Sequence, residues 1–311
     1  MDLLTPTIPL IRQFQSIEWL VEPMRFLSLL GNEEFFVLLL PLVYWLVSRR
    51  VGAQLGVLLL VSVVVNGLFK IAFGLPRPYW GGEVLSLSQE TSFGFPSGHA
   101  QNAALLWTFL ALQSSARRVF VPLALLLALL ISLSRIYLGV HYPLDILGGW
   151  FLGFSLLALY LRFKAPLFAW WNGSLAARKI VLVAVLVFAL WLPFSFFVGG
   201  AIETDASPQT QARIAALASK VANLGAVLGL FVGLSLVPKW ETQCGPTIKI
   251  ARFLVGFAGL ALIYIGLKKV LPESDVFRFG RYFLTTFWVT YGAPMLFLRT
   301  RLASLEVKKA I

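Results

Sequence analysis

Long hydrophobic segments separated by short polar stretches run through almost the whole chain. A helix that crosses the hydrocarbon core of a bilayer needs about 17 to 25 mainly apolar residues. Nine segments meet or nearly meet this requirement, at about 34–48, 51–74, 98–114, 119–138, 142–161, 180–200, 214–237, 250–271 and 280–298. The pattern therefore predicts an all-α, polytopic membrane protein built as a helical bundle of about nine transmembrane helices, with eight or ten as alternatives.

A further apolar stretch, Ile8–Leu30, precedes these segments but carries charges. Four charged residues interrupt it: Arg12, Glu18, Glu22 and Arg25. Because burying such charges in hydrocarbon costs several kcal/mol, we expect residues 1–31 to form an amphipathic helix that lies in the membrane interface. A tenth transmembrane helix is the alternative interpretation.

Composition supports a membrane protein and argues against a soluble one. Hydrophobic residues make up 59% of the 311 residues and charged residues only 13%, with a mean hydropathy of +0.83. Soluble domains are roughly half apolar and a quarter charged. The net charge of +12 could indicate a nucleic-acid partner, but the Lys and Arg residues lie between apolar segments instead of forming a basic face. We therefore expect membrane lipid as the partner and no nucleic acid.

Charged residues between the predicted spans are distributed unevenly over the two sides. One side carries only two acids, Glu241 and Glu306, and 15 of the 26 basic residues: Arg49, Arg50, Arg117, Arg118, Arg162, Lys164, Arg178, Lys179, Lys239, Lys249, Arg252, Arg299, Arg301, Lys308 and Lys309. The other side carries the remaining acids, among them Glu33, Glu34, Glu203 and Asp205. Basic residues mark the cytoplasmic side. We expect an integral plasma (inner) membrane protein with a cytoplasmic C-terminus and with the loops 75–97 and 139–141 outside.

Polar residues are concentrated in the first part of the chain, which suggests three regions. We expect the interfacial segment 1–31, a core of five spans over 32–165, and an accessory region of four spans over 166–311. The last boundary falls in the basic segment 162–179, which is expected to be a cytoplasmic linker.

Small residues repeat at intervals of four in two predicted spans. They are Gly149 and Gly153 in the fifth span and Gly225, Gly229 and Gly233 in the seventh. Such faces let helices pack closely in lipid. Packing within the chain is the favoured interpretation, and a homodimer interface is the alternative.

Three cations and both histidines of the chain stand at the predicted extracytoplasmic ends of spans: Lys70, Arg77, Arg135, His99 and His141. Charged groups at the edge of a bilayer are costly and are usually functional. Taken singly, Lys70 and Arg135 could instead extend along the membrane to reach water. Taken together, the three cations would balance a phosphate dianion, whose oxygens an arginine can bind in pairs.

Two short segments add polar groups at the same face. Ser97 and Gly98 open an apolar helix, where backbone N–H groups favour an anion, although Ser97 could be simply an N-cap. His141 and Asp145 are four residues apart, so a helical turn places them on one face, where a carboxylate can orient an imidazole. Asp145 could equally be an ordinary acid in the first turn of a helix that begins at Pro143. His99 is left free to act as a general acid.

These residues stand in three blocks that resemble the signature motifs of the type 2 phosphatidic acid phosphatase superfamily. The blocks are Lys70-x6-Arg77-Pro78, Pro96-Ser97-Gly98-His99 and Ser134-Arg135-x5-His141-x3-Asp145. The resemblance covers roughly residues 34–162. The last four predicted spans lie outside it and are similar to a bacterial-type subgroup that has extra C-terminal transmembrane helices.

The resemblance implies a role for each matching residue. His141 would be the nucleophile that forms a phosphohistidine, Asp145 would activate it, and His99 would protonate the leaving group and then activate water. The phosphate would be held by Lys70, Arg77, Ser97, Gly98 and Arg135. Members of this superfamily need no Mg²⁺, so neither a metal nor another cofactor is expected. The residues alone leave open which histidine attacks.

The expected function is metal-independent hydrolysis of a lipid phosphate or diphosphate monoester at the extracytoplasmic face of the membrane. Candidate substrates are phosphatidic acid, phosphatidylglycerophosphate and an isoprenyl diphosphate carrier. A phosphotransferase that uses the same intermediate is one alternative. A transporter or flippase for an anionic lipid is another, but it needs no His–Asp pair, and the chain shows no inverted repeat of the kind found in transporters.

Overall fold

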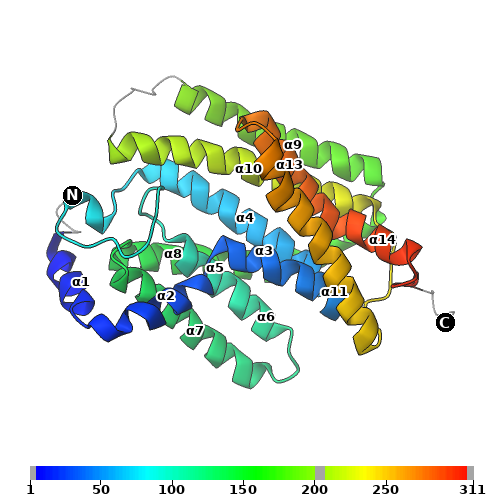
Figure 1. Cartoon of the computed structure of the whole chain (residues 1–311), viewed down its shortest axis with the longest axis horizontal. Coiled ribbons are helices and arrows are strands. Elements are labelled where there is room, and N and C mark those ends of the chain that lie inside the picture. The colour runs from blue at the N-terminus through cyan, green and yellow to red at the C-terminus, as the bar shows by residue number, and fades with distance from the viewer. Residues whose placement is uncertain (1–4, 200–206, 307–311) are drawn as a thin grey trace. The chain divides into compact units, whose positions relative to one another are not determined.

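The computed structural model describes residues 5–199 and 207–306. The acids Glu203 and Asp205 and the basic residues Lys308 and Lys309, which the predicted orientation uses, lie outside these residues. Within them, the regular elements are helices, apart from one isolated antiparallel bridge between Trp240 and Leu305. The predicted all-α class is therefore confirmed (Figure 1).

The α-helices are α1 (Ile8–Gln15), α2 (Val21–Leu29), α3 (Glu33–Leu42), α4 (Arg49–Phe73), α5 (Gly98–Asn102), α6 (Thr108–Leu112), α7 (Arg117–Tyr137), α8 (Pro143–Gly173), α9 (Ala176–Gly199), α10 (Pro208–Leu236), α11 (Pro246–Ala261), α12 (Leu267–Val270), α13 (Asp275–Phe287) and α14 (Ala293–Arg299). They form two compact units. The first unit comprises the described parts of Met1–Phe36, Val61–Lys164 and Gly200–Leu217, and the second those of Val37–Leu60, Ala165–Gly199 and Ala218–Ile311.

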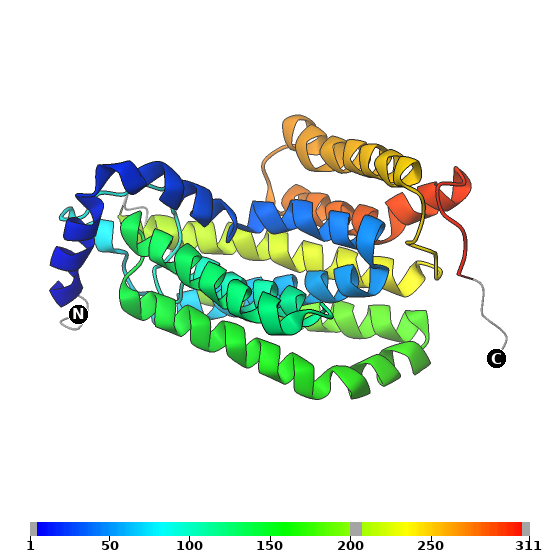
Figure 2. The same ribbon diagram turned by 90° about the horizontal axis from the view of Figure 1, so that it is seen from below.

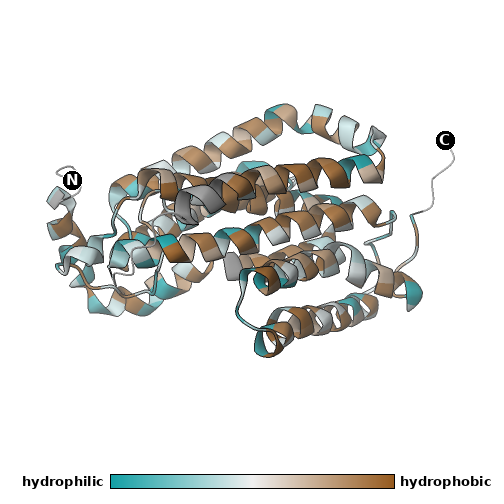
Figure 3. Cartoon of the chain, turned by 90° about the horizontal axis from the view of Figure 1, so that it is seen from above, coloured by the Kyte–Doolittle hydropathy of each residue, from teal (hydrophilic) through white to brown (hydrophobic). Residues whose placement is uncertain are grey.

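Five helices in the described part of the chain are long and apolar enough to cross a membrane: Arg49–Gly81, Arg117–Tyr137, Pro143–Gly173, Pro208–Leu236 and Pro246–Val270. Hydrophobic residues run along most of the length of the long helices (Figure 3). A shorter apolar helix covers Phe35–Val47. The chain is therefore membrane-integral, while the total of nine spans stays a prediction.

Two of the predicted spans are interrupted by π-helical turns. The segment 98–114 folds as α5, a π-helical turn at Ala103–Trp107 and α6. The segment 280–298 falls in α13, a π-helical turn at Trp288–Gly292 and α14. A π-helical turn adds a residue to one turn, which a pattern of apolar residues alone does not reveal.

The N-terminal segment was expected to be one helix, and it forms two. A short 3₁₀ turn at Glu18–Leu20 separates α1 from α2, and Pro23 stands in the first turn of α2, where its missing N–H costs little. Both helices lie against the end of α7 (Figure 2). Phe14 packs edge-on against Tyr137 with ring centroids 5.1 Å apart, and the Tyr137 hydroxyl donates to the Ile17 carbonyl at 2.9 Å.

The segment 162–179, expected to be a linker, is almost entirely helical. Helix α8 continues to Gly173, with Pro166 inside it, and α9 begins at Ala176. Only Ser174 and Leu175 separate the two helices. The apolar and aromatic residues between the basic ones allow this continuation, and the chain breaks where Gly173 weakens the helix.

Two contacts hold α5 in place within the first unit. A buried polar network joins it to α4, in which Gln101 donates to Ser62 at 2.9 Å and accepts from Asn66 at 2.9 Å. On the other side, Gly149 and Gly153 let α8 approach, because a Cβ at either position would collide with a backbone carbonyl of Ser97 or Gln101. The small-residue face of the fifth span is thus used within the chain.

The second glycine series is also used within the chain, in the second unit. A Cβ at Gly225, Gly229 or Gly233 would collide with atoms of the segment Phe279–Thr290. The hydroxyl of Thr286 donates to the Ala226 carbonyl at 2.8 Å between the same elements. The homodimer suggested by such faces stays a prediction.

Candidate active site

His141 and Asp145 meet at the start of α8, as their spacing predicts. Oδ2 of Asp145 lies 3.1 Å from Nδ1 of His141, and both side chains are almost fully buried. The same oxygen accepts from the backbone N–H of Tyr142 at 2.9 Å, so it also caps the helix that begins at Pro143. Asp145 therefore makes both contacts that the sequence suggested, one to the imidazole and one at the start of the helix, while its catalytic role stays a prediction.

The start of α5 is joined to the start of α8. The backbone N–H of Ser97 donates to the Asp145 carbonyl at 2.9 Å, and the Ser97 hydroxyl accepts from the Ala100 N–H at 3.5 Å. Ser97 is therefore the N-cap of α5. Gly98 leaves room beside Asn66, whose Oδ1 would lie 3.3 Å from an added Cβ.

His99 projects from α5 toward Asn32, which lies between α2 and α3. Its Nε2 lies 2.5 Å from Oδ1 of Asn32. An amide oxygen only accepts hydrogen bonds, so this contact assigns the hydrogen to Nε2 and leaves Nδ1 as the second, free ring nitrogen. Nothing in the sequence connects these two residues.

Lys70 ends its helix close to the loop that follows it. Its ammonium donates to the Ser92 hydroxyl at 3.1 Å and to the Phe93 carbonyl at 2.5 Å. The side chain is buried. It therefore does not extend along the membrane to water, which was the alternative considered for it.

Arg77 is held by backbone carbonyls on two sides. Its Nε donates to the Ser92 carbonyl at 2.5 Å, and its Nη1 donates to the Val140 carbonyl at 2.9 Å. Nη1 also lies 3.4 Å from Nε2 of His141. The guanidinium is thus fixed beside the ring nitrogen that faces away from Asp145.

Arg135 is as deeply buried as Arg77, each being 1% exposed. Its two terminal nitrogens donate to the Ser28 hydroxyl and to Oε1 of Glu90. Its Nε has no hydrogen-bond partner among the described residues, although it is buried. This unsatisfied donor is the kind of group that a bound anion would satisfy.

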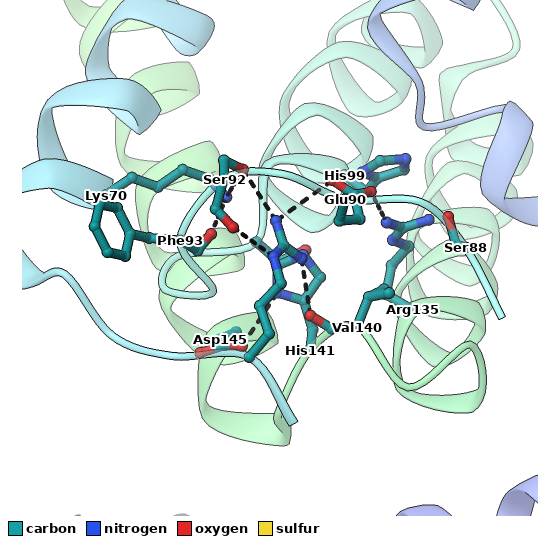
Figure 4. Close-up of polar contacts among 12 residues, drawn as sticks. Lys70, Ser88, Glu90, Ser92, Phe93, His99, Arg135, Val140, His141 and Asp145 are labelled. Atoms are coloured by element: carbon teal, nitrogen blue, oxygen red, sulfur yellow. Dashed lines mark hydrogen bonds and ion pairs between the residues drawn. The ribbon is translucent and has the colours of Figure 1, made fainter. Parts of the chain in front are cut away.

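Glu90 lies between the two arginines, next to His99 (Figure 4). Its Oε2 is 3.4 Å from Nη2 of Arg77. Burial alone raises the pKa of a carboxyl, but the charges of Arg135 and Arg77 outweigh burial and lower the pKa of Glu90 to about 2. Glu90 is therefore a carboxylate at neutral pH.

A cavity of about 700 Å³ connects these groups. Six of the eight predicted site residues line it: Lys70, Arg77, Gly98, His99, Arg135 and His141. Ser97 and Asp145 do not line the cavity; Ser97 caps α5, and Asp145 contacts His141. Burial, followed by the charges of Arg77 and Lys70, lowers the pKa of His141 well below its ordinary value, so its imidazole is neutral at pH 7 and free to act as a nucleophile.

Several residues around the cavity carry no signal in the sequence. Ser28, Asn32, Asn66, Glu90 and Ser92 line it, and each bonds to one of the predicted residues or supports its helix. Polar residues near predicted span ends could have suggested Asn66. Ser28 lies in α2, Asn32 lies between α2 and α3, and Glu90 and Ser92 lie in the loop after α4. The hydrophobic pattern does not define the conformation of these segments.

Within the described residues, no group of three or more His, Cys, Asp or Glu side chains is placed to hold a metal ion. The charged groups around the cavity are mainly cations. Such a set of side chains suits an anion with several oxygen atoms.

Two family models match separate parts of the chain. The model described as the PAP2 superfamily matches residues 51–169, and a model described as PAP2 superfamily phosphatase, transmembrane extension, matches residues 221–305. The first match contains all eight predicted site residues. The second covers most of the accessory region.

Curated relatives extend the similarity. The chain is 27% identical to a dihydrosphingosine 1-phosphate phosphatase of Schizosaccharomyces pombe, over 72% of this chain and 54% of that protein. It is 34% identical to phosphatidylglycerophosphatase B of Bacillus subtilis, over 50% of this chain and 78% of that protein. It is 30% identical to an undecaprenyl-diphosphatase of Sulfolobus acidocaldarius, over 46% of this chain and 71% of that protein. The chain thus spans about half the length of the first of these relatives.

Proposed function

Because the chain belongs to the PAP2 superfamily, we propose that it is a membrane-integral lipid phosphatase that acts through a phosphohistidine intermediate. The observation that carries the proposal is the position of His141. Its Nδ1 is held by Asp145, while its Nε2 lies 3.4 Å from Arg77 at the cavity. The unshared pair on Nε2 therefore points to where the cations would hold a phosphate.

In the first step, Nε2 of His141 attacks the phosphorus atom and the bond from phosphorus to the lipid oxygen breaks. Asp145 stabilises the positive charge that develops on the imidazole. The leaving oxygen takes a proton from Nδ1 of His99, which enters this step as an imidazolium with its other proton on Nε2, and the lipid alcohol departs. A lipid alkoxide is a poor leaving group, so this proton transfer lowers the barrier substantially.

In the second step, water attacks the phosphorus atom of the phosphohistidine. His99, now neutral, takes a proton from that water, and the bond between phosphorus and Nε2 breaks. Inorganic phosphate leaves and both histidines return to their starting forms. Lys70, Arg77 and Arg135 stabilise the negative charge of the phosphoryl oxygens in both steps. Gly98 supplies a backbone hydrogen-bond donor at the start of α5, while Ser97, whose own N–H is bonded to Asp145, caps that helix.

The substrate class follows from the site and the relatives together. The three relatives are named for a sphingoid phosphate, a phosphatidylglycerol phosphate and an undecaprenyl diphosphate. Each of these carries a terminal phosphate on a lipid. We propose a lipid phosphate or diphosphate monoester as the substrate class.

We further propose that the site opens to the extracytoplasmic face of the plasma membrane and that the C-terminus is cytoplasmic. Basic residues are concentrated at the other ends of the spans. The phosphate would then sit at the interface while the lipid chains remain in the bilayer.

The direct test is phosphate release by the purified full-length protein in detergent micelles. Phosphatidic acid, phosphatidylglycerophosphate and an isoprenyl diphosphate would be supplied separately, with the His141→Ala variant as the control. Release from at least one substrate by the natural protein and none by the variant supports the proposal. Absence of release from all three, with the protein folded, contradicts it. Transfer of the phosphoryl group to an added alcohol in preference to water would instead indicate a phosphotransferase.

A further inference from the structure

Glu90 occupies the place where the proposed reaction needs the anion of the substrate. Its two carboxylate oxygens face Arg135 and Arg77, the two guanidinium groups that would hold the phosphate. The side chain is 21% exposed and lines the same cavity as His99 and His141. Substrate phosphate and the Glu90 carboxylate therefore compete for the same donors.

The backbone around Glu90 is anchored, so the competition concerns its side chain. The Tyr79 hydroxyl donates to the Glu90 carbonyl at 2.5 Å. Two residues further on, the Ser92 carbonyl accepts from Nε of Arg77 at 2.5 Å. A rotation about the side-chain bonds of Glu90 would break its ion pairs with Arg77 and Arg135 without a movement of the loop backbone.

The charges and donors of the site favour an anion larger than a carboxylate. Lys70, Arg77 and Arg135 line the cavity, and Glu90 is the one carboxylate among its described lining residues, which leaves an excess of positive charge. In addition, Nε of Arg135 is buried and has no partner in the described part of the chain. A phosphate monoester offers three terminal oxygens and up to two negative charges, so it satisfies more of the site than Glu90 does.

We propose that Glu90 determines specificity by making the site select dianionic phosphate monoesters over the monoanionic phosphodiesters of ordinary phospholipids. This inference rests on the function proposed above. Coulomb attraction scales with the charge of the ligand, so a dianion gains about twice as much from the same cations as a monoanion. A phosphodiester has no charge advantage over Glu90, which is tethered and has an effective concentration of about millimolar or more.

In a bilayer, this selection would keep abundant phosphodiester lipids out of the site. Phosphodiester head groups surround the site at high concentration and would otherwise occupy the two arginines without reacting. The tethered carboxylate excludes them, while a phosphate monoester displaces the carboxylate and reaches His141.

The test compares the binding of two anions that carry no lipid chain. Tungstate, a dianion, and dimethyl phosphate, a monoanion, would be titrated against the full-length protein in micelles, with thermal stabilisation as the readout. The natural protein should bind tungstate far more tightly. In Glu90→Gln, which keeps the size of the side chain, the affinity for dimethyl phosphate should rise by roughly tenfold or more, equivalent to about 1.4 kcal/mol. Inhibition of phosphatidic acid hydrolysis by phosphatidylglycerol should strengthen in parallel.

Glu83→Gln is the matched control. Glu83 belongs to the same loop but is exposed and makes no ion pair within the described residues; the variant should match the natural protein for both anions. Glu90→Asp, whose carboxylate reaches less far, should give a smaller change of the same sign, and it carries the test if Glu90→Gln does not fold.

Two outcomes would overturn the inference. One is unchanged or weaker binding of dimethyl phosphate in both Glu90 variants, and the other is an equal gain in Glu83→Gln. Anion binding is measured without turnover. A protein that hydrolyses no lipid phosphate but shows the Glu90-dependent selection would therefore contradict the proposed function and retain the role of Glu90 in anion selection.

Discussion

The amide oxygen Oδ1 of Asn32 lies 2.5 Å from Nε2 of His99. Because this contact fixes the hydrogen on Nε2, it directs Nδ1 to serve as the acid and base of the proposed reaction. Asn32 stands between α2 and α3, at the first position of the region 32–165 that was expected to be the five-span core. The connection between α2 and α3 therefore orients His99, the acid and base of the proposed reaction.

Asn32→Ala is expected to slow lipid phosphate hydrolysis by about two- to tenfold, the effect of losing a neutral hydrogen bond of about 0.5–1.5 kcal/mol. The loss should fall on kcat, with KM little changed, because Asn32 holds the proton donor. Asn32→Asp should restore activity and move the alkaline limb of the pH profile upward, since a carboxylate favours a protonated His99. The exposed Asn172 provides the control Asn172→Ala. Equal damage to the burst of nitrophenolate release, which needs no proton donor, would indicate a structural role instead.

The two histidines should respond differently to the leaving group. His141→Ala is expected to abolish turnover of both lipid and nitrophenyl phosphates, because the nucleophile is needed for every substrate. His99→Ala should reduce lipid turnover by roughly 10²–10⁴-fold but keep a burst of nitrophenolate release, since nitrophenolate leaves without a proton. Rapid-mixing kinetics measures the burst.

The species trapped in His99→Ala should carry phosphate on His141, in a linkage that acid cleaves and base does not. A burst in His141→Ala combined with none in His99→Ala would reverse the assigned roles.

Removal of metal ions should leave activity unchanged. The negative charge of the substrate would be met by Lys70, Arg77 and Arg135, which are fixed around the cavity. Phosphate release measured in EDTA should therefore equal the rate without chelator. Complete loss that Mg²⁺ restores would contradict this part of the mechanism.

The protonation state of His141 can be measured directly, because the chain contains only two histidines. Its pKa lies well below the ordinary value, which is about 6.5. In ¹⁵N-histidine spectra of His99→Ala, the remaining imidazole should stay neutral at pH 6.5. Since the unfolded chain takes up this proton more readily, the free energy of unfolding should rise with pH between the lowered pKa and about 6.5. A midpoint at or above pH 6.5 would disagree with the buried position of His141.

The uneven distribution of basic residues predicts that the loop carrying Glu90 lies on the extracytoplasmic side of the membrane. In a variant that lacks Cys244, the Glu83→Cys substitution, in the loop that carries Glu90, should react with an impermeant thiol reagent in intact cells. Cysteine at Ala165 should react only after the cells are opened. Both positions are exposed in the structure, so the difference in labelling reports the side of the membrane. The reverse pattern would place the site on the cytoplasmic face.

The convergence of the site could be predicted from the chain because each motif ends or begins a long helix on the same side. Lys70 is in the last turn of α4, Arg135 is in the last turn of α7, and His141 directly precedes α8. Alternation of direction between successive spans then brings these ends together. The hydrophobic pattern carries this information, because helix length and membrane thickness are matched.

Glu90 and Asn32 could not be predicted in the same way. Both act through contacts with residues far away in the chain, Glu90 with Arg135 and Asn32 with His99. Their segments have no regular period that would fix the direction of a side chain. Only the folded structure shows which polar residues of these segments reach the cavity.

Burial of a cation also proved to be an incomplete guide to function. Arg252 is 1% exposed, like Arg77 and Arg135, yet it lies in the second unit and donates to backbone carbonyls of Trp45, Glu241, Thr242 and Leu302. The sequence placed it among the residues that mark the cytoplasmic side. A buried arginine can thus be used entirely for carbonyl groups, whereas Arg77 and Arg135 also line the cavity.

Oδ2 of Asp145 holds both the ring of His141 and the backbone N–H group of Tyr142, the residue that precedes α8. His141, the proposed nucleophile, is therefore attached to the end of a helix, where the backbone N–H groups have no partner within the helix. Opening of this first turn alone would separate Asp145 from His141. The proposed activity should therefore be lost at a lower temperature than the bulk of the helical structure.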